Sequence, residues 1–275
     1  MTRITRCALL VSVGLSISSA FAGEPMTMIL SGRYQLRVGD ALDKSAKIYR
    51  SEKLAQVLVV SSALSNPVLI GGGAKTAKLL DPTALKPVEG DSDSVVFDPD
   101  QTVGAPIATI VDGGNLRFAV GTTRAAIEPA DPLLGDLSVE TVLGALPEWR
   151  RNIVHYKPGI GDIRLLDTIE TPTEVEVFFG SWCPHCEKYV PRLLSVVAAL
   201  KGKNLTFRFH GVPHKFDDDP EVRLNKVTGL PTGLVRQGGK VVARIEEISW
   251  EQPEGALSAV LFGEASVAPG SGSGS

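Results

Sequence analysis

Two of the three cysteines in the chain, Cys183 and Cys186, stand in the stretch SWCPHC with two residues between them. A C-x-x-C pair can act as a redox couple, supply half of a metal site, or form a small structural disulfide. Redox exchange and metal binding both use the thiolate, because the deprotonated sulfur is the nucleophile and the metal ligand. The elements that hold the two cysteines bear on all three hypotheses.

The pair lies between a predicted strand at 173–180 and a predicted helix at 186–202. Cys183 is therefore expected at the helix N-terminus, where unpaired N–H groups and the helix dipole favour a thiolate. Cys186, one turn later and more enclosed, is expected to attack a mixed disulfide at Cys183 and release the substrate. The helix is predicted from apolar residues at helical spacing, namely Val190, Leu193, Leu194, Val197 and Leu200.

The elements that follow predict a mixed sheet for the C-terminal part of the chain. A strand at 205–212, a helix at 219–229, a hairpin at 233–246 that turns at two glycines, and a helix at 253–263 come in that order. Together with the strand and helix around the cysteines, the order is β, α, β, α, β, β, α. This order implies a sheet with helices on both faces.

The sequence Trp182-Cys183-Pro184-His185-Cys186 at a strand-to-helix junction, followed by GLPT with Pro231, resembles the thioredoxin superfamily. The resemblance covers about 163–264. It implies the fold class, an α/β thioredoxin fold with a mixed sheet flanked by helices, preceded here by a mainly-β N-terminal domain. It also implies that Cys183 is the nucleophile and that Cys186 resolves the mixed disulfide.

The same resemblance implies a substrate groove beside the cysteines. Pro231 is expected to be a cis-proline that faces the pair, and the backbone of Leu230 to pair with a bound substrate peptide. Trp182 is expected to form an apolar lip beside Cys183. Without the resemblance, packing would be the simplest role for Trp182, and a trans bond would be expected before Pro231, since only about 5–6% of such bonds are cis.

The dipeptide between the cysteines looks like that of the strongly oxidising periplasmic members of the superfamily. His185 would donate to the thiolate or add positive charge near it, which stabilises the reduced form and makes the disulfide a better oxidant. The expected activity is thiol–disulfide exchange on exported proteins, with the Cys183–Cys186 disulfide as the redox group, no other cofactor, and a redox partner in the membrane. The alternative is a periplasmic reductase or isomerase that receives electrons from the membrane.

Two departures from the family pattern concern proton transfer and size. The family often places a buried acid six residues before the first cysteine, and here that position is Val177. Glu174 and Glu176 lie nearby but, by strand alternation, on the opposite face of the strand. The stretch between Cys186 and Pro231 also has no room for the extra helical domain of the oxidases that share CPHC.

A metal site is a second hypothesis. Cys183, Cys186, His210 and His214 form the pattern C-x2-C-x23-H-x3-H, which is similar to a zinc ligand set. The central gap exceeds the roughly 12 to 15 residues of a zinc finger, and the predicted helix fills it. Zinc or copper would suit these ligand types. A structural disulfide is the third hypothesis, although so small a ring adds little stability.

The first 22 residues are typical of an export signal. Two arginines precede an apolar run at 8–13, and Ala20-Phe21-Ala22 offers a small-x-small cleavage site. Because the run falls short of the roughly 20 apolar residues of a membrane span, we expect cleavage after Ala22 and a periplasmic protein, with an uncleaved anchor as the alternative. Cleavage removes Cys7, so the remaining cysteine pair meets an oxidising compartment.

The predicted domains are a mainly-β domain at 23–160, a thioredoxin-like domain at 161–264 and a flexible Gly/Ser tail at 265–275. About eight strand-like runs between 27 and 135 indicate a sandwich or small barrel, with the clearest hairpin at 110–120. A short helix capped by Ser138 follows, with Pro147 near its end. The Pro- and Gly-rich stretch at 156–162 is the expected joint between the domains.

The net charge of the chain and one glycine-rich stretch argue against binding of nucleic acids and of phosphate groups. The net charge of −3 and the absence of basic clusters exclude a nucleic-acid footprint. The stretch IGGGAKT lacks the spacing of a phosphate-binding loop. Two roles remain open for the N-terminal β domain, namely homodimerisation of the chain or the holding of a client protein.

Overall fold

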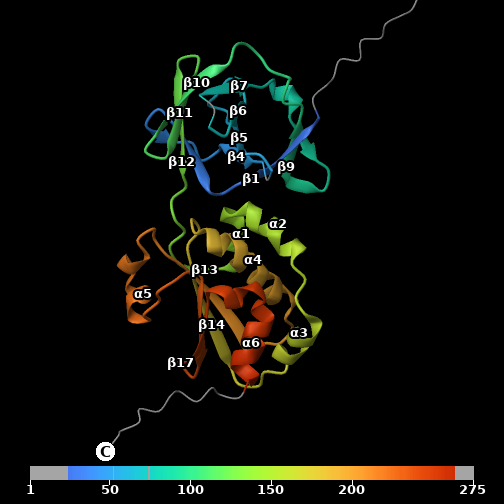
Figure 1. Ribbon diagram of the computed structural model, residues 1–275, viewed down its shortest axis with the longest axis vertical. Coiled ribbons are helices and arrows are strands. Elements are labelled where there is room, and N and C mark those ends of the chain that lie inside the picture. The colour runs from blue at the N-terminus through green and yellow to red at the C-terminus, as the bar shows by residue number, and fades with distance from the viewer. Residues whose placement is uncertain (1–23, 52, 74, 264–275) are drawn as a thin grey trace, which may run out of the picture.

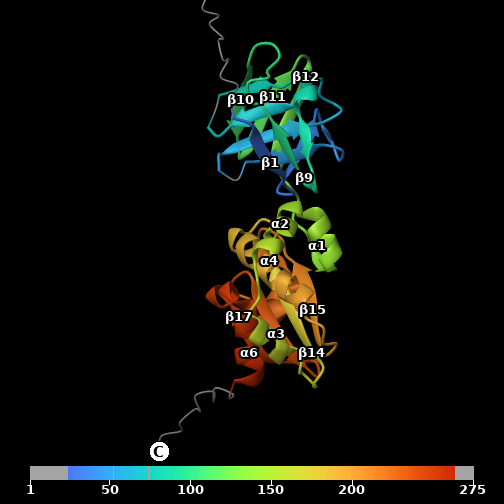
Figure 2. The same ribbon diagram turned by 90° about the vertical axis from the view of Figure 1, so that its right-hand side faces the viewer.

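The structure is a computed structural model that describes residues 24–51, 53–73 and 75–263. Two units lie one above the other along the long axis, an all-β unit and a unit that carries the α-helices (Figures 1 and 2). The predicted export signal at 1–22 and the tail at 265–275 lie outside the described residues. No helix within the described ranges is long and apolar enough to cross a membrane.

The all-β unit, here called the β module, spans β1 to β12 and consists of one sheet. Its strand order is β3-β2-β12-β11-β10-β7-β6-β5-β4-β1-β9-β8, and every pairing is antiparallel because short turns connect most neighbours. The strands are β1 Met26–Leu30, β2 Tyr34–Val38, β3 Ala41–Leu42, β4 Lys47–Arg50, β5 Gln56–Val60, β6 Val68–Gly71, β7 Thr76–Leu79, β8 Lys86–Val88, β9 Asp91–Phe97, β10 Ile107–Asp112, β11 Asn115–Val120 and β12 Thr123–Pro129.

The sheet curls around two apolar clusters (Figure 1). Buried and exposed side chains alternate along its strands, as in β11, where Phe118 and Val120 are buried and Ala119 is exposed. The hairpin predicted at 110–120 is confirmed, with Asp112 opposite Asn115. Gly113 and Gly114 turn the chain with φ of 58° and 85°, a left-handed conformation that glycine adopts without steric cost.

The second unit, here called the α-containing module, spans β13 to α6. Its five-stranded sheet has the order β13-β15-β14-β16-β17, in which only β14 and β15 are parallel. Its elements are β13 Gly135–Leu137, α1 Val139–Ala145, α2 Pro147–His155, α3 Ile160–Leu166, β14 Thr173–Phe179, α4 Pro184–Ala199, β15 Leu205–Gly211, the 3-10 helix Phe216–Asp218, α5 Pro220–Leu224, β16 Thr232–Gln237, β17 Lys240–Glu246, the 3-10 helix Glu247–Glu251 and α6 Pro253–Phe262.

The predicted fold class is wrong. The described residues are mostly β, with a twelve-stranded antiparallel sheet, a five-stranded sheet and six α-helices, and this is not an α/β thioredoxin fold with flanking helices. The physical reason lies in the connections. Short turns join most strands and produce antiparallel ladders, whereas an α/β fold depends on crossovers between parallel strands.

The division between the two units also differs from the predicted boundary at 160 and 161. Val142 of α1 and Trp149 of α2 are buried in the main core of the α-containing module. The stretch at 156–162 is no joint, because Tyr156 Oη and the Gly159 N–H both donate to the Glu254 carboxylate of α6. Ser138 caps α1 as predicted, but Pro147 begins α2 instead of ending α1. The chain crosses between the modules after β12 and before β13 (Figure 1).

β14 and α4 together position the cysteines. Val175, Val177 and Phe179 of β14 belong to the same core cluster as both cysteines, while Phe178 belongs to a cluster on the other side. α4 buries Val190, Leu193 and Leu194 in that core. A buried strand therefore leads directly into the turn that carries the C-x-x-C pair, and a well-packed helix leads away from it.

Candidate functional site

Cys183 is the residue from which α4 begins. It is the N-cap of the helix, with extended backbone angles (φ −81°, ψ 124°), and its carbonyl accepts from the Glu187 N–H at 3.0 Å. Pro184 takes the first helical position, where a missing N–H has no cost. The side chain of Cys183 is 7% exposed. The predicted placement of this cysteine at a helix N-terminus is thus found.

The environment of Cys183 favours its ionised form. The pKa of its thiol is lowered to about 6, chiefly because the Cys186 side chain hydrogen-bonds to it. The backbone N–H groups of Cys186 and His185 and the charge of the His185 ring act in the same direction, while burial opposes them. At neutral pH this sulfur is mostly a thiolate, the form that attacks disulfides.

Cys186 has the opposite environment. Its side chain is fully buried, and burial raises the pKa of its thiol well above the ordinary value; the hydrogen bond and charge of Cys183 raise it further. The Gly180 N–H donates to its sulfur at 3.4 Å. The two sulfurs therefore differ in ionisation: the pKa of Cys183 is lowered and that of Cys186 is raised, although both residues are buried.

The peptide bond between Leu230 and Pro231 lies near the Cys183 sulfur, although it is distant from it in sequence. The Leu230–Pro231 peptide bond is cis, as predicted. The Cys183 thiol contacts the Leu230 carbonyl oxygen at 3.8 Å. The Pro231 carbonyl accepts from Trp250 Nε1 at 3.1 Å, which fixes this corner of β16 to the core. The structure thus brings both predicted groove residues to the cysteines.

Trp182 and His185 flank the pair on different sides. Trp182 is partly exposed, and its Nε1 donates to the Val212 carbonyl at 3.2 Å while its ring stacks 5.1 Å from that of His214. His185 is exposed, with its ring 6.2 Å from the Tyr189 ring. Both predicted residues are therefore at the site, one as part of its wall and one at its solvent side.

A cavity of about 240 Å³ lies beside Trp182 and His214 and has residues of both modules in its walls. Arg33 and Tyr34 of the β module line it, and so does Ser181, whose Oγ accepts from the Leu133 N–H at 3.1 Å. The β module therefore forms part of the wall of a cavity beside Trp182, the residue before Cys183. Sequence reasoning contained no signal for this contact.

Val177 is buried among the core residues near Cys186, as the sequence predicts, and supplies no acid there. The neighbouring carboxylate, Glu176, is fully buried on the other face of β14. It accepts from Arg208 Nη2 at 2.6 Å and from Arg236 Nη2 at 2.8 Å. The only carboxylate buried in β14 is thus committed to two arginines and not to the cysteine pair.

The proposed metal ligands do not come together. His210 is held by carboxylates, with Nδ1 2.8 Å from Asp136 and Nε2 3.3 Å from Asp219. His214 stacks on Trp182. In the part of the chain that the structure describes, no group of three or more His, Cys, Asp and Glu side chains is arranged to hold a metal ion.

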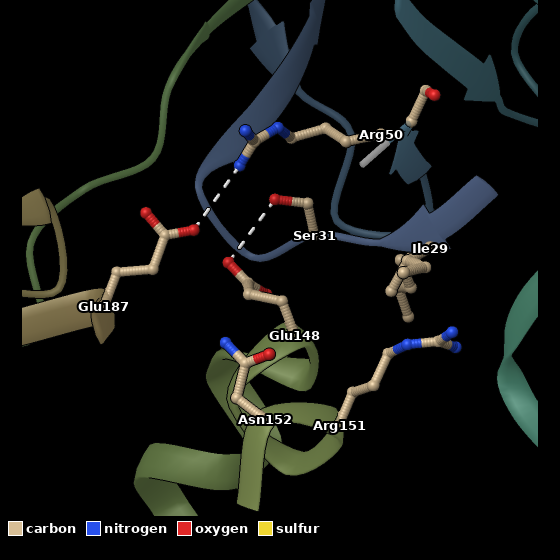
Figure 3. A pocket seen from close by; sticks show the side chains of 9 residues that line it. Ile29, Ser31, Arg50, Glu148, Arg151, Asn152 and Glu187 are labelled. Atoms are coloured by element: carbon tan, nitrogen blue, oxygen red, sulfur yellow. Dashed lines mark hydrogen bonds and ion pairs between the residues drawn. The ribbon is translucent and has the colours of Figure 1, made fainter. Parts of the chain in front are cut away.

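Glu187 is a residue of the site neighbourhood that sequence reasoning missed. It follows Cys186 on α4, and its carboxylate lies 3.7 Å from Arg50 (Figure 3) and also bonds to Arg33, both in the β module. These partners are far away in sequence and belong to another unit. No local pattern could have indicated the contact.

Comparison with known proteins adds little to this geometry. No family model and no curated protein matches the chain. Among solved structures, a protein of unknown function from Pseudomonas aeruginosa is 18% identical, with a TM-score of 0.35, and covers 46% of this chain and 87% of its own. A designed HIV epitope-scaffold is 20% identical, with a TM-score of 0.30, and covers 46% of this chain and 78% of its own.

Proposed function

We propose that this protein carries out thiol–disulfide exchange on exported proteins through Cys183 and Cys186. The observation that carries the proposal is the opposite displacement of the two thiol pKa values within one C-x-x-C pair, to about 6 for Cys183 and well above the ordinary value for Cys186. A metal ligand pair or a structural crosslink has no need of this asymmetry. The motif itself is similar to the active site of the thioredoxin superfamily.

In the oxidising direction, the reaction begins with the Cys183–Cys186 disulfide. A substrate thiolate attacks the sulfur of Cys183, a mixed disulfide forms, and the bond to Cys186 breaks with Cys186 leaving as a thiolate that takes up a proton. A second substrate thiolate then attacks the substrate sulfur of the mixed disulfide, and Cys183 leaves. The substrate loses two electrons and gains a disulfide, and the pair ends as the dithiol.

The electrostatics of the pair suit this sequence of steps. The low pKa of Cys183 makes it a good leaving group in the second step, because leaving ability rises as the thiol pKa falls. The high pKa of Cys186 keeps it protonated once it is released. Each turnover requires reoxidation of the dithiol, and a redox partner in the membrane is the source we propose for a protein exported to the periplasm.

The direction of exchange is proposed from the CPHC dipeptide. The charge of His185 helps to lower the pKa of Cys183 and so stabilises the reduced pair, which makes the disulfide more oxidising. The reverse direction, reduction or isomerisation of client disulfides, uses the same two sulfurs. The potential of the pair in glutathione buffers separates them: a value well above about −200 mV supports the oxidant, and one near or below about −250 mV overturns that direction.

Exchange itself is tested by refolding a reduced, disulfide-containing protein with the oxidised full chain. We expect disulfides to form in the client, and none with Cys183→Ser. With a client that already carries a disulfide, reduced Cys186→Ser should give a trapped covalent complex, because its Cys183 thiolate attacks the client disulfide, one client sulfur leaves as a thiolate, and no Cys186 thiol is present to release the other. Ser258→Ala, a buried change on α6, serves as the folding control. Equal rates for wild type and Cys183→Ser would overturn the proposal.

A further inference from the structure

The strongest unexplained feature near the cysteines is the contact between α4 and the β module. Glu187 lies in the first turn of α4, directly after Cys186, and its N–H donates to the Cys183 carbonyl at 3.0 Å. Its side chain pairs with Arg50 at the end of β4 (Figure 3) and with Arg33, which follows β1. Two arginines of one module thus surround one carboxylate of the reactive helix.

The three charged side chains of this contact are partly buried. The side chains of Glu187, Arg33 and Arg50 are 28%, 25% and 36% exposed. Glu187 and Arg50 line a cavity of about 220 Å³. A second carboxylate, Glu148 of α2, lines the same cavity and accepts from the Gly32 N–H at 2.9 Å. Because the pairs are partly desolvated, they are screened less by salt than exposed pairs.

The groups in this cavity interact electrostatically. Burial raises the pKa of Glu148, the negative charge of Glu187 raises it further, and Arg50 lowers it. The charge of Glu187 therefore acts on Glu148, and Arg50 offsets it there. Cys183 is the N-cap of the same helix, four residues before Glu187, a spacing at which side chains on a helix come close to one another.

An uncompensated carboxylate at this position would oppose the Cys183 thiolate, because like charges disfavour ionisation. Arg33 and Arg50 come from a module that supplies no part of the C-x-x-C turn. Their pairing with Glu187 cancels a negative charge in the first turn of the helix that begins at Cys183, and it also joins the two modules. This is a specific task for the β module.

On this basis, which rests on the proposed function, we propose that Arg33 and Arg50 are positioning residues for the thiol chemistry. They neutralise Glu187 on the reactive helix, so that the docked β module favours the ionised, reduced form of the cysteine pair. The β module then influences the redox site electrostatically, through its two arginines, without contacting the reacting sulfurs.

The remaining charged and titratable groups around these residues are known from the structure. His185 and Cys186 face Cys183 from α4, and His214 lies beyond Trp182. Glu148 faces Glu187 from α2. Lys188, the next cation on α4, is engaged by Glu251 at 2.9 Å.

The test is a titration of the Cys183 thiolate in the reduced full chain, followed by its ultraviolet absorbance at low ionic strength. We expect the double variant Arg33→Met/Arg50→Met to raise the pKa of Cys183 by roughly 0.5, because Glu187 is left unpaired. We expect Glu187→Gln to lower it by a similar amount, since the arginines remain without their carboxylate. High salt should shrink both changes.

Arg37→Met is the matched control, because Arg37 pairs with Glu128 within the β module. Opposite signs distinguish a charge effect from damage to the structure. Mere detachment of the β module that exposed Cys183 would lower its pKa, since burial raises it. Changes of the same sign in the arginine and glutamate variants, or no change in either, overturn the inference.

The titration also separates this inference from the proposed function. The thiolate can be titrated whether or not the protein exchanges disulfides with a client. Inactive wild type with the expected opposite changes would overturn the function and leave the charge coupling intact. A wild type that exchanges disulfides, together with variants that leave the pKa of Cys183 unchanged, would overturn the charge coupling and leave the proposed function intact. If the arginine variant does not fold, Glu187→Gln, which keeps the size and polarity of the side chain, still decides the sign.

Discussion

At the scale of single residues, the site depends on what surrounds each of two identical side chains. Cys183 accepts hydrogen bonds from Cys186 and from backbone N–H groups at the start of a helix, whereas Cys186 is fully buried beside a sulfur that tends to be negative. Each cysteine therefore shifts the pKa of the other, and the two shifts have opposite directions. His185 adds a smaller electrostatic contribution from the solvent side.

This order of causes leads to a prediction for the pH dependence of alkylation. In the wild type, the rate at Cys183 should rise as the pH passes about 6 and level off above that, since only the thiolate reacts. Cys186→Ala should move the midpoint to higher pH, because it removes the largest cause of the lowered pKa. His185→Ala should move it in the same direction by less. The alkylation rates are to be measured with a small neutral reagent. A larger shift of the midpoint for His185→Ala than for Cys186→Ala would show that His185, and not Cys186, is the main cause of the lowered pKa of Cys183.

At the scale of elements, α2 forms a layer between the two units. Trp149 points into the core of the α-containing module, with its ring 5.7 Å from that of Phe179, the last residue of β14 before the cysteine turn. Arg150 and Arg151 on the same helix pair with Asp93 and Asp91 of β9. One helix thus supports the strand that leads to the site and also contacts the β module.

Removal of the buried indole should therefore destabilise the α-containing module. Trp149→Ala is expected to lower the free energy of unfolding by about 3–5 kcal/mol, the usual result of emptying a buried aromatic site. Val154→Ala on the same helix, where the side chain is 60% exposed, should change it by less than about 0.5 kcal/mol. Urea unfolding followed by circular dichroism measures both, and similar values for the two variants would show that α2 is not part of the core.

At the scale of the whole molecule, ion pairs are prominent where the modules meet. Glu187 with Arg33, Arg50 with Glu187, and Arg151 with Asp91 each join one module to the other. The chain itself crosses once between β12 and β13 (Figure 1). The relative position of the modules thus depends on charge as well as on the connecting segment.

Salt should consequently loosen this arrangement. Between about 0.1 M and 1 M salt, the screening length falls from roughly 10 Å to roughly 3 Å, which weakens partly exposed ion pairs. We expect the radius of gyration from small-angle X-ray scattering to increase over this range while the circular dichroism of both modules stays the same. An unchanged radius would show that the apolar contacts and the connection hold the modules without the charges.

Local signals in the sequence were sufficient for the elements around the site. The C-x-x-C spacing, the glycine turn at Gly238 and Gly239, and the order of elements from β14 to α6 could all be predicted, because each depends on neighbouring residues. The fold class was predicted wrongly. Pairings such as Ala125 of β12 with Val38 of β2 leave no local trace, and they determine how short strands add up to one large sheet.

Contacts between segments that are distant in the chain could not be predicted from the sequence either. Arg33 and Glu187 are 154 positions apart, and neither belongs to a motif. Trp149 lies on a helix that its position in the chain assigned to the N-terminal domain, yet its burial places it in the other core. The placement of Cys183 at a helix N-terminus could thus be predicted from the sequence, while the surroundings of the pair required coordinates.

On the proposed function, the small exposed fraction of Cys183 would decide when a client protein could be attacked. A sulfur that is 7% exposed, beside Trp182 and under the Leu230 carbonyl, is reached by a thin, pliable stretch of chain more easily than by the rigid surface of a finished protein. Selection between clients would then rest on timing. A cysteine would react while its chain is still unfolded and would escape once it is packed.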